Sequence, residues 1–411
     1  MLLQLLLSSL AATSVATATA TAPSPWKQDR FAISFWVDPI VPPSQFDYEY
    51  QRIANANFTV LLGGFGATTP TTVAQQIAAA TKHNLAPVPS ICSGACANIS
   101  GAWGFQIKDE PPAASFAAVA KLVAEAKAVS QMAFVNLLPN YATPAQLGAN
   151  TYGEYVHTYM DIVKPNMLSM DHYPNFDEHS GGNKTKKGYI LNLLVLREAS
   201  LSVTPNIPFW NFFNAMPYAT SMYDVSEGEL RWQVWTSVAC GSKGVLYFCY
   251  WTPAGFAKGQ AIMTPTPGQP PNVATQSPGT KYPMAQRINS KLKVLGNWLL
   301  ERTSSAVVQT SGVGTVQLMQ LPWSSINGSV ASPADSSFML GCYDNNNTIL
   351  LVNQDSNHPA LATVGLVPGY GKKMMEIDAH GAMVVALDDG PFMDGFQIAL
   401  VSGDARLFTW V

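Results

Sequence analysis

The sequence predicts an α/β fold, a (β/α)8 TIM barrel followed by a small antiparallel β-sandwich domain. Eight short apolar runs alternate with segments of helical periodicity over residues 27–303, which is typical of a parallel sheet. From residue 304 onward, apolar residues alternate in period two between frequent turns, as in antiparallel sheets. With 411 residues, 47% hydrophobic and 12% charged, the chain can bury a large core.

The first 22 residues are predicted to be a secretory signal peptide. They contain an apolar run followed by small residues of the Ala-x-Ala type, which signal peptidase accepts. Five Asn-x-Ser/Thr sequons agree with a secretory route; they begin at Asn57, Asn98, Asn183, Asn327 and Asn346. Later segments lack the ~20 uninterrupted apolar residues that span a bilayer. We therefore expect a secreted protein without an integral membrane segment.

The strand-like runs follow the signal peptide in a regular order. They are residues 31–37, 58–64, 86–91, 104–109, 132–138, 167–171, 208–213 and 244–251. Helical periodicity marks residues 116–130, 152–163, 188–200, 228–240 and 286–303. Eight repeats favour a closed barrel over an open sheet. The Pro/Gly/Thr-rich residues 264–283 are expected to form an extended excursion before the last helix, so the predicted domains are residues 27–303 and 304–411.

Charge and cysteine content narrow the functional classes. The formal net charge is −3 and no long basic run occurs, so we expect a small neutral partner and no nucleic acid. Cys92 and Cys96 lie close enough in sequence for a disulfide, whereas Cys240, Cys249 and Cys342 lie in apolar runs typical of buried thiols. Without a CxxC or a nearby His pair, neither a metal nor another cofactor is expected.

Several polar residues lie where the predicted strands end. In a (β/α)8 barrel the reacting groups gather at this end of the strands. The candidates are Asp38, Asp109, Glu110, Asp171, His172, Tyr173, Asn211, Asn214 and Trp251. Carboxyls that converge on one mouth raise each other's pKa, so that one stays protonated near neutral pH. A protonated and an ionised carboxyl together are what glycosidic bond cleavage requires.

Four features of the chain resemble the glycoside hydrolases of clan A. They are Asp-Glu-Pro at residues 109–111, the Trp that ends GVLYFCYW, the preceding helical stretch at residues 229–244, and the trailing β-domain. The resemblance implies that Glu110 is the catalytic acid and that Asp109 stands where the family has an Asn that contacts the sugar's 2-hydroxyl. It also implies that Trp251 is the platform under the cleaved sugar, since aromatic faces stack on pyranose C–H groups.

The seventh strand departs from that family, whose nucleophile is a Glu at its end. This chain has Asn211 and Asn214 there, and its next acids are Asp224, Glu227 and Glu229. Because Glu227 and Glu229 begin a predicted helix, we expect them to act as first-turn carboxylates favoured by the helix dipole. Asp171 is therefore the leading candidate for the second catalytic carboxylate, and Asp38 is the next.

The sequence thus predicts a secreted glycoside hydrolase that cleaves O-glycosidic bonds of an oligo- or polysaccharide with Glu110 and Asp171. The predicted sugar contacts are Asp38, Asp109, His172, Tyr173, Asn211 and Trp251. Trp36, Trp210 and Trp232 are expected to be packing residues. Two alternatives stay open: Glu110 as a helix-start carboxylate next to Pro111, and the whole chain as an inactive carbohydrate-binding or cell-surface protein.

Overall fold

The computed structural model describes most of the chain outside its first 24 residues. The described residues are 25–90, 99–175, 185–254, 260–265, 276–309, 316–317, 329–331, 338–344, 347–364, 373–389 and 396–411. Three sets of predictions lie outside the described residues: the signal peptide, the pairing of Cys92 with Cys96, and the sequons at Asn98, Asn183, Asn327 and Asn346. Within the described part, none of the helices has the length and apolar character to span a membrane.

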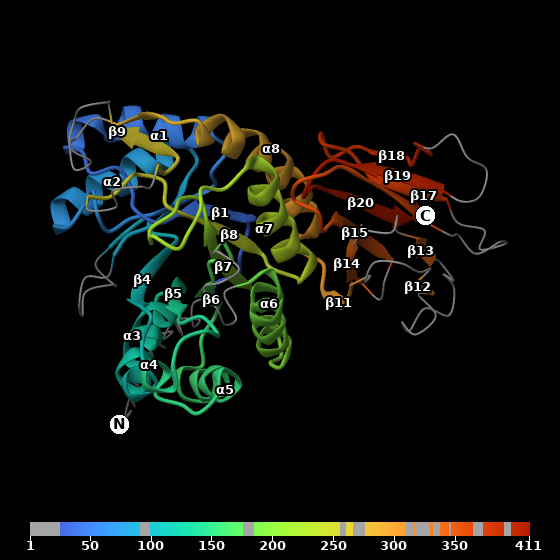
Figure 1. The fold of residues 1–411 in the computed structure, drawn as a ribbon. Helices are drawn as coiled ribbons and strands as arrows, with labels where there is room; N and C mark the ends of the chain where they lie inside the picture. The colour runs from blue at the N-terminus through green and yellow to red at the C-terminus, as the bar shows by residue number, and fades with distance from the viewer. Residues whose placement is uncertain are drawn as a thin grey trace, which may run out of the picture.

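A curled sheet of six parallel strands forms the centre of the molecule (Figure 1). Its spatial order is β1 (Ala32–Phe35), β8 (Gly244–Phe248), β7 (Phe209–Asn214), β6 (Leu168–Asp171), β5 (Met132–Leu137) and β4 (Gly104–Asp109). A second parallel pair consists of β2 (Val60–Leu62) and β3 (Ala86–Val88). All eight predicted strands are therefore confirmed, and these sheets place the strands' carboxyl ends on one side.

Backbone hydrogen bonds connect the β2–β3 pair to both edges of the six-stranded sheet. The amide of Thr59 donates to the carbonyl of Ile33 over 2.9 Å, beside β1. The amide of Gln106, in β4, donates to the carbonyl of Pro89 over 2.9 Å, and Ser90 forms a parallel bridge with Gln106. The pair therefore lies between β1 and β4.

Helices follow most strands and cover the sheet. They are α1 (Phe46–Asn55), α2 (Pro70–Lys82), α3 (Phe116–Ala128), α4 (Pro144–Leu147), α5 (Tyr152–Val163), α6 (Lys186–Leu201), α7 (Glu227–Ala239) and α8 (Lys281–Leu300), with 3-10 turns at Pro43–Gln45 and Ala113–Ser115. The predicted helices correspond to α3, α5, α6, α7 and α8. The described residues between β3 and β4 hold no helix. Before α8, the strands β9 (Met263–Pro265) and β10 (Gln276–Pro278) form a two-stranded antiparallel ribbon.

The C-terminal part consists of antiparallel sheets. One has the order β11 (Ser304–Gln309), β14 (Phe338–Tyr343), β15 (Thr348–Asn353), β20 (Ala405–Trp410), β17 (Met374–Ile377), β18 (Met383–Val385). The other has β12 (Val316–Gln317), β13 (Ser329–Ala331), β16 (Ala360–Val364) and β19 (Phe396–Leu400). Leu340 and Cys342 of the first sheet share an apolar cluster with Ile398 and Leu400 of the second. The period-two pattern of the sequence therefore predicted these antiparallel sheets correctly.

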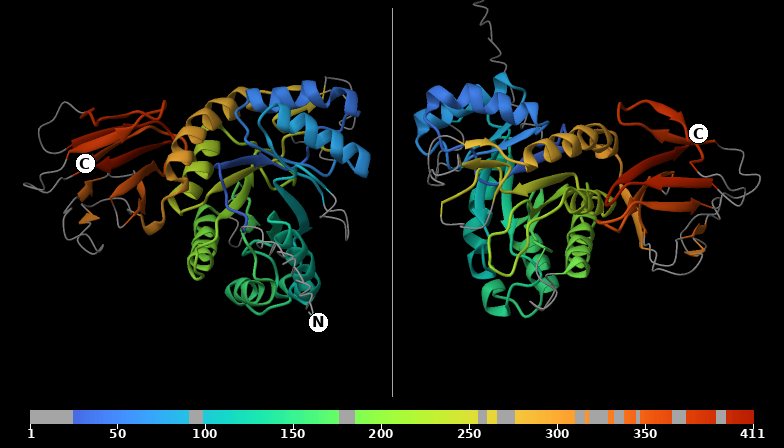
Figure 2. Two further views of the ribbon diagram at one scale, coloured as in Figure 1. Left: turned by 180° about the vertical axis from the view of Figure 1, so that it is seen from behind. Right: turned by 45° about the horizontal axis from the view of Figure 1, so that its top comes forward.

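Helix α7 joins the two parts of the molecule. Its residues are almost all buried, because one side packs on the parallel sheet and the other on β14 and β15 (Figure 2). Gly341 of β14 approaches so closely that an added Cβ would lie 2.5 Å from the Cα and the carbonyl oxygen of Ala239. The Trp232 indole donates to Gln354 Oε1 over 3.1 Å, across the contact between α7 and the C-terminal sheets. Cys240 and Cys342 near it are buried free thiols, as is Cys249, as predicted.

Candidate active site

A pocket of about 470 Å³ opens where β4, β5 and β6 end. Three acids contribute to its wall, Asp109, Glu110 and Asp171. The other lining residues are Trp36, Asn136, Leu138, Pro139, Tyr141, Ala142, Thr143, Gln146, Tyr173, Phe212, Tyr218 and Phe248. Lys, Arg and His are absent from this described lining. The structure thus brings both predicted catalytic residues and two predicted sugar contacts, Asp109 and Tyr173, to one pocket.

Asn136 of β5 lies between the acids of the two flanking strands. Its Nδ2 donates to Asp109 Oδ1 and to Asp171 Oδ1, each over 3.2 Å. Its Oδ1 accepts a hydrogen bond of 3.1 Å from the Ser169 hydroxyl. Two oxygens that share one nitrogen donor at this distance lie about 5 Å apart, so Asp109 and Asp171 are fixed as close neighbours.

Glu110 and Asp171 are in direct contact, because their carboxyls share a hydrogen bond. Two ionised carboxylates only accept hydrogen bonds, so this contact holds a proton. Burial raises the pKa of Asp171 well above its ordinary value, and the charges of Glu110 and Asp109 raise it further. Burial in the pocket wall and the charge of Asp109 also raise the pKa of Glu110, whereas the hydrogen bond between the two carboxyls lowers the pKa of Glu110 and raises that of Asp171. The pair therefore keeps its proton to a higher pH than an isolated carboxyl.

The backbone of Glu110 adopts a left-handed conformation with φ of 43°, which is uncommon for a residue with a side chain. Its amide donates to the carbonyl of Asn136 over 2.8 Å, and the Tyr155 hydroxyl donates to the carbonyl of Pro111 over 2.7 Å. Backbone strain of this kind costs on the order of 1–3 kcal/mol and is concentrated at functional sites. The predicted helix-start alternative explains neither this strain nor the contact of Glu110 with Asp171.

Aromatic side chains form the remaining walls. Trp36 packs edge-on against Phe212 with ring centroids 5.8 Å apart, and Tyr173 contacts Phe248 at 5.2 Å. Tyr141 and Tyr218, from loops after β5 and β7, share a hydrogen bond. Trp36 was predicted to be a packing residue, yet it lines the pocket. Trp251, which the sequence analysis predicted to be the sugar platform, is not among the lining residues, whereas Phe248 and Trp36 are.

Asp38 lies outside this lining and is fully buried. Its Oδ1 accepts from the amide of Phe65 over 2.8 Å, and its Oδ2 accepts from the amide of Gly66 over 3.1 Å and from Gln76 Nε2 over 2.8 Å. Both oxygens are thus engaged in holding the loop after β2. That loop carries Phe65, which packs on Trp36 with centroids 5.4 Å apart, so Asp38 supports the pocket wall from behind.

The buried Asp38 carboxyl makes stability depend on pH. Burial raises its pKa from 3.8 to about 6, so the folded chain holds this proton more tightly than the unfolded chain. The resulting stabilisation is complete below pH 3.8 and is lost as the pH rises through about 6. Relative to Asp38→Asn, we expect the unfolding free energy of the wild type to fall by about 2 kcal/mol between pH 4 and pH 7.

Urea unfolding of both proteins at several pH values measures this difference. Asp29→Asn is the matched control, since Asp29 is exposed on the surface. Parallel stability curves for the wild type and Asp38→Asn would contradict the prediction.

Three further predicted contact residues are also buried and outside the described lining. The amide of Asn211 donates to the Tyr189 hydroxyl over 2.8 Å and to Ser237 Oγ over 3.0 Å. The Trp251 backbone pairs with Val37 and Met263. His172 lies 3.1 Å from Asn192 Oδ1 through its Nδ1, and its ring packs against Tyr141 with centroids 5.0 Å apart. His172 thus borders the pocket indirectly, through Tyr141.

The acids after β7 have structural partners. Glu229 forms a capping box with Ser226 at the start of α7, and its Oε1 accepts from the Tyr223 hydroxyl over 2.8 Å. Glu227 pairs with Arg231 and Arg287, and Asp224 pairs with Lys281. The predicted first-turn role of Glu227 and Glu229 is confirmed, and these acids do not contribute to the described pocket wall. Among the described residues, no group of His, Cys, Asp or Glu is arranged to hold a metal ion.

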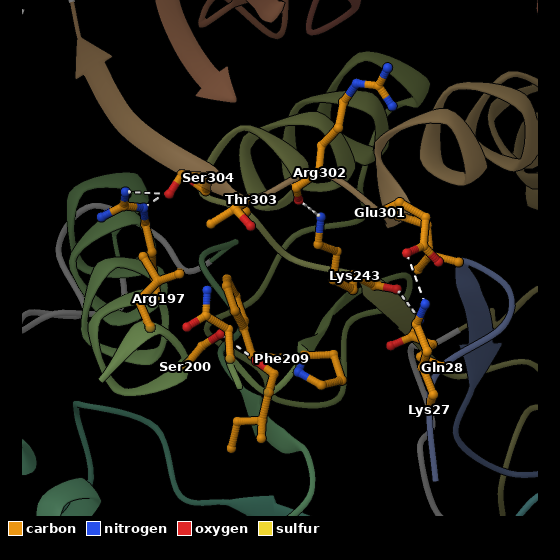
Figure 3. A pocket seen from close by; sticks show the side chains of 16 residues that line it. Lys27, Gln28, Arg197, Ser200, Phe209, Lys243, Glu301, Arg302, Thr303 and Ser304 are labelled. Atoms are coloured by element: carbon orange, nitrogen blue, oxygen red, sulfur yellow. Dashed lines mark hydrogen bonds and ion pairs between the residues drawn. The ribbon is translucent and has the colours of Figure 1, made fainter. Parts of the chain in front are cut away.

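A second cavity, of about 190 Å³, lies at the amino ends of β7 and β8 (Figure 3). Its polar groups bind one another. Lys243 Nζ donates to the carbonyls of Leu299 and Arg302, over 2.6 and 2.5 Å, and Arg197 Nε donates to Ser304 Oγ over 2.9 Å. Burial lowers the pKa of Lys243 to about 8. These hydrogen bonds hold the end of α8 against the parallel sheet, so we interpret this cavity as a structural contact between elements and not as a binding site.

No protein-family model and no curated protein matches the chain. Similar solved structures include a glycoside hydrolase family 5 protein from Bacteroides vulgatus ATCC 8482, with 12% identity, a TM-score of 0.47, and coverage of 95% of this chain and 90% of that one. A family 51 α-L-arabinofuranosidase from Bifidobacterium longum has 11% identity, a TM-score of 0.45, and coverage of 96% and 97%. A β-galactosidase from Halorubrum lacusprofundi has 8% identity, a TM-score of 0.48, and coverage of 92% and 99%.

These three proteins are glycoside hydrolases by name. Their identities to this chain do not exceed 12% and their TM-scores lie below 0.5. The chain is similar to these glycoside hydrolases in fold.

Proposed function

We propose that the protein is a secreted glycoside hydrolase that cleaves O-glycosidic bonds with Glu110 as the acid and Asp171 as the second carboxylate. In this proposal residues 27–303 form a closed (β/α)8 barrel and residues 304–411 a β-sandwich domain. One observation carries it: a proton-holding carboxyl pair lies beside a third acid in a pocket with aromatic walls. Acid catalysis at a glycosidic oxygen needs such a proton, and sugar rings stack on aromatic faces.

The spacing of the acids indicates how substrate would engage them. Glycosidases of either stereochemistry hold their two carboxyls at least about 5 Å apart, with the scissile bond between them. Glu110 and Asp171 are closer in the unliganded chain because they share a hydrogen bond. In this proposal a sugar separates the pair, and the shared proton passes to the leaving oxygen through Glu110. Asp109, held by Asn136, would accept a hydrogen bond from a sugar hydroxyl.

The charge of the pocket favours glycans without acidic groups. Three carboxyls and none of the basic residue types line it within the described structure. A uronate or sulfate group would therefore meet like charge without a compensating cation, which disfavours binding. The expected substrate is a neutral or weakly charged oligo- or polysaccharide.

The test is a screen of the secreted protein for reducing-sugar release from neutral glycans and for hydrolysis of neutral aryl glycosides. Release, with neutral glycans preferred over uronate-containing ones, is the expected result. Proton NMR of the first-formed anomer then distinguishes retention from inversion. Binding of the same glycans without any release would overturn the hydrolase proposal.

The second candidate is a carbohydrate-binding protein without activity. Two observations favour it: β7 ends in Asn214, without a carboxylate, and Glu110 and Asp171 stabilise each other in the unliganded chain. On this view the aromatic walls and acids would bind sugar hydroxyls only. The same screen separates the candidates, because a binding protein would show glycan affinity that Glu110→Gln leaves largely unchanged.

A further inference from the structure

Asn136 is the polar residue that the carboxyl cluster is built around. It lies in an otherwise apolar strand, and only 3% of its surface is exposed. Both bonds of its amide nitrogen go to acids, one to Asp109 on β4 and one to Asp171 on β6. A buried amide with both donors directed at carboxylates is costly to replace, because those carboxylates lose their partners.

The direction of these hydrogen bonds follows from chemistry. An ionised carboxylate only accepts, so the NH₂ edge of the amide must face the two acids. The Ser169 hydroxyl donates to the opposite edge over 3.1 Å and keeps the amide from rotating. One oxygen of each Asp is thus always an acceptor. Hydrogen bonds to the charged form of an acid lower its pKa, so Asn136 favours ionised Asp109 and ionised Asp171.

At Asp171 this lowering of the pKa opposes the effect of burial, which raises the pKa. Burial draws the proton of the Glu110–Asp171 pair toward Asp171, where a leaving oxygen in the pocket has poorer access to it. Glu110 lines the same pocket and is more exposed than Asp171. Asn136 donates a hydrogen bond to Asp171 and not to Glu110. It therefore shifts the shared proton toward Glu110, which donates it to the leaving oxygen in the proposed reaction.

We propose that Asn136 is a positioning residue that holds Asp109 and Asp171 side by side and biases the proton of the carboxyl cluster away from both of them and toward Glu110. Its effect on hydrolysis rests on the proposed function. Its effect on proton placement does not, since it concerns the unliganded carboxyls alone.

The test is a pH titration of the full-length secreted protein by NMR, with ¹³C in the Asp and Glu side-chain carboxyls. Signals are assigned with Asp109→Asn, Asp171→Asn and Glu110→Gln. In Asn136→Ala we expect the titration midpoints of both Asp109 and Asp171 to rise by about one pH unit or more. Ser169→Ala, which keeps Asn136 but frees its amide to rotate, should raise them less in the same direction.

Asn140→Ala is the matched control, because the Asn140 amide donates to the Gly188 carbonyl and not to an acid. It should leave the three midpoints unchanged. Unchanged Asp109 and Asp171 midpoints in both Asn136→Ala and Ser169→Ala would overturn the inference. Shifted midpoints in a protein that releases no sugar would uphold proton placement and refute the hydrolase proposal. Sugar release with unshifted midpoints would do the reverse.

Discussion

Replacing Glu110 by Gln is expected to lower the turnover number for glycoside hydrolysis by ~100-fold or more. Gln keeps the size and shape of the side chain but has no acidic proton for the leaving oxygen. The loss should be large for alkyl or sugar leaving groups and small for nitrophenyl groups, which depart with little protonation. Steady-state kinetics with a series of leaving groups measures both effects.

A matched control tests whether the loss is local. Glu125 is an exposed residue of α3 on the same helix-forming segment that follows β4, and Glu125→Gln should retain wild-type turnover. Equal loss for every leaving group would contradict the acid role of Glu110. It would indicate instead that breaking the contact with Asp171 disturbs binding.

Replacing Gly341 by Val is expected to destabilise the whole chain by about 3 kcal/mol. The Cβ of any residue there would lie 2.5 Å from the Ala239 Cα and carbonyl oxygen, and helix backbone cannot yield as a flexible side chain can. The β14 strand and α7 must therefore move apart. The free energy of unfolding in guanidinium chloride, followed by tryptophan fluorescence, measures the effect.

Gly153 of α5 provides the control, since nothing lies within 4 Å of a Cβ added there. Gly153→Ala should raise stability by roughly 0.5–1 kcal/mol, because Ala is the better helix former. A Gly341→Val protein as stable as the wild type would show that the seam between α7 and β14 tolerates a wider spacing.

The fold was largely predictable because its strands are short, apolar and separated by periodic helices. Periodicity found all eight strands, yet it does not report hydrogen bonding between residues far apart in sequence. The bond from Thr59 to Ile33 and the bridge from Ser90 to Gln106 are such contacts.

The candidate site was predictable in part. The strand-end rule found Asp109, Glu110, Asp171 and Tyr173, which do line the pocket. It also selected Asp38, Asn211 and Trp251, because it does not say whether a strand-end side chain points to the pocket or into the interior. Asn136 was overlooked, although an amide within an apolar strand was the available signal. The aromatic walls depended on where each strand stops: β8 ends at Phe248, before Trp251.

The burial of α7 on nearly every side has a consequence for how such proteins can be recombined. A helix that is buried on nearly every side needs neighbours on all sides, and here the C-terminal sheets provide some of them, through β14 and β15. The β-rich part therefore does not behave as an interchangeable module that evolution or a protein engineer can remove or swap. A shortened chain that ends after α8 would lose the Gln354 partner of Trp232 and expose part of the α7 surface to water, which favours aggregation.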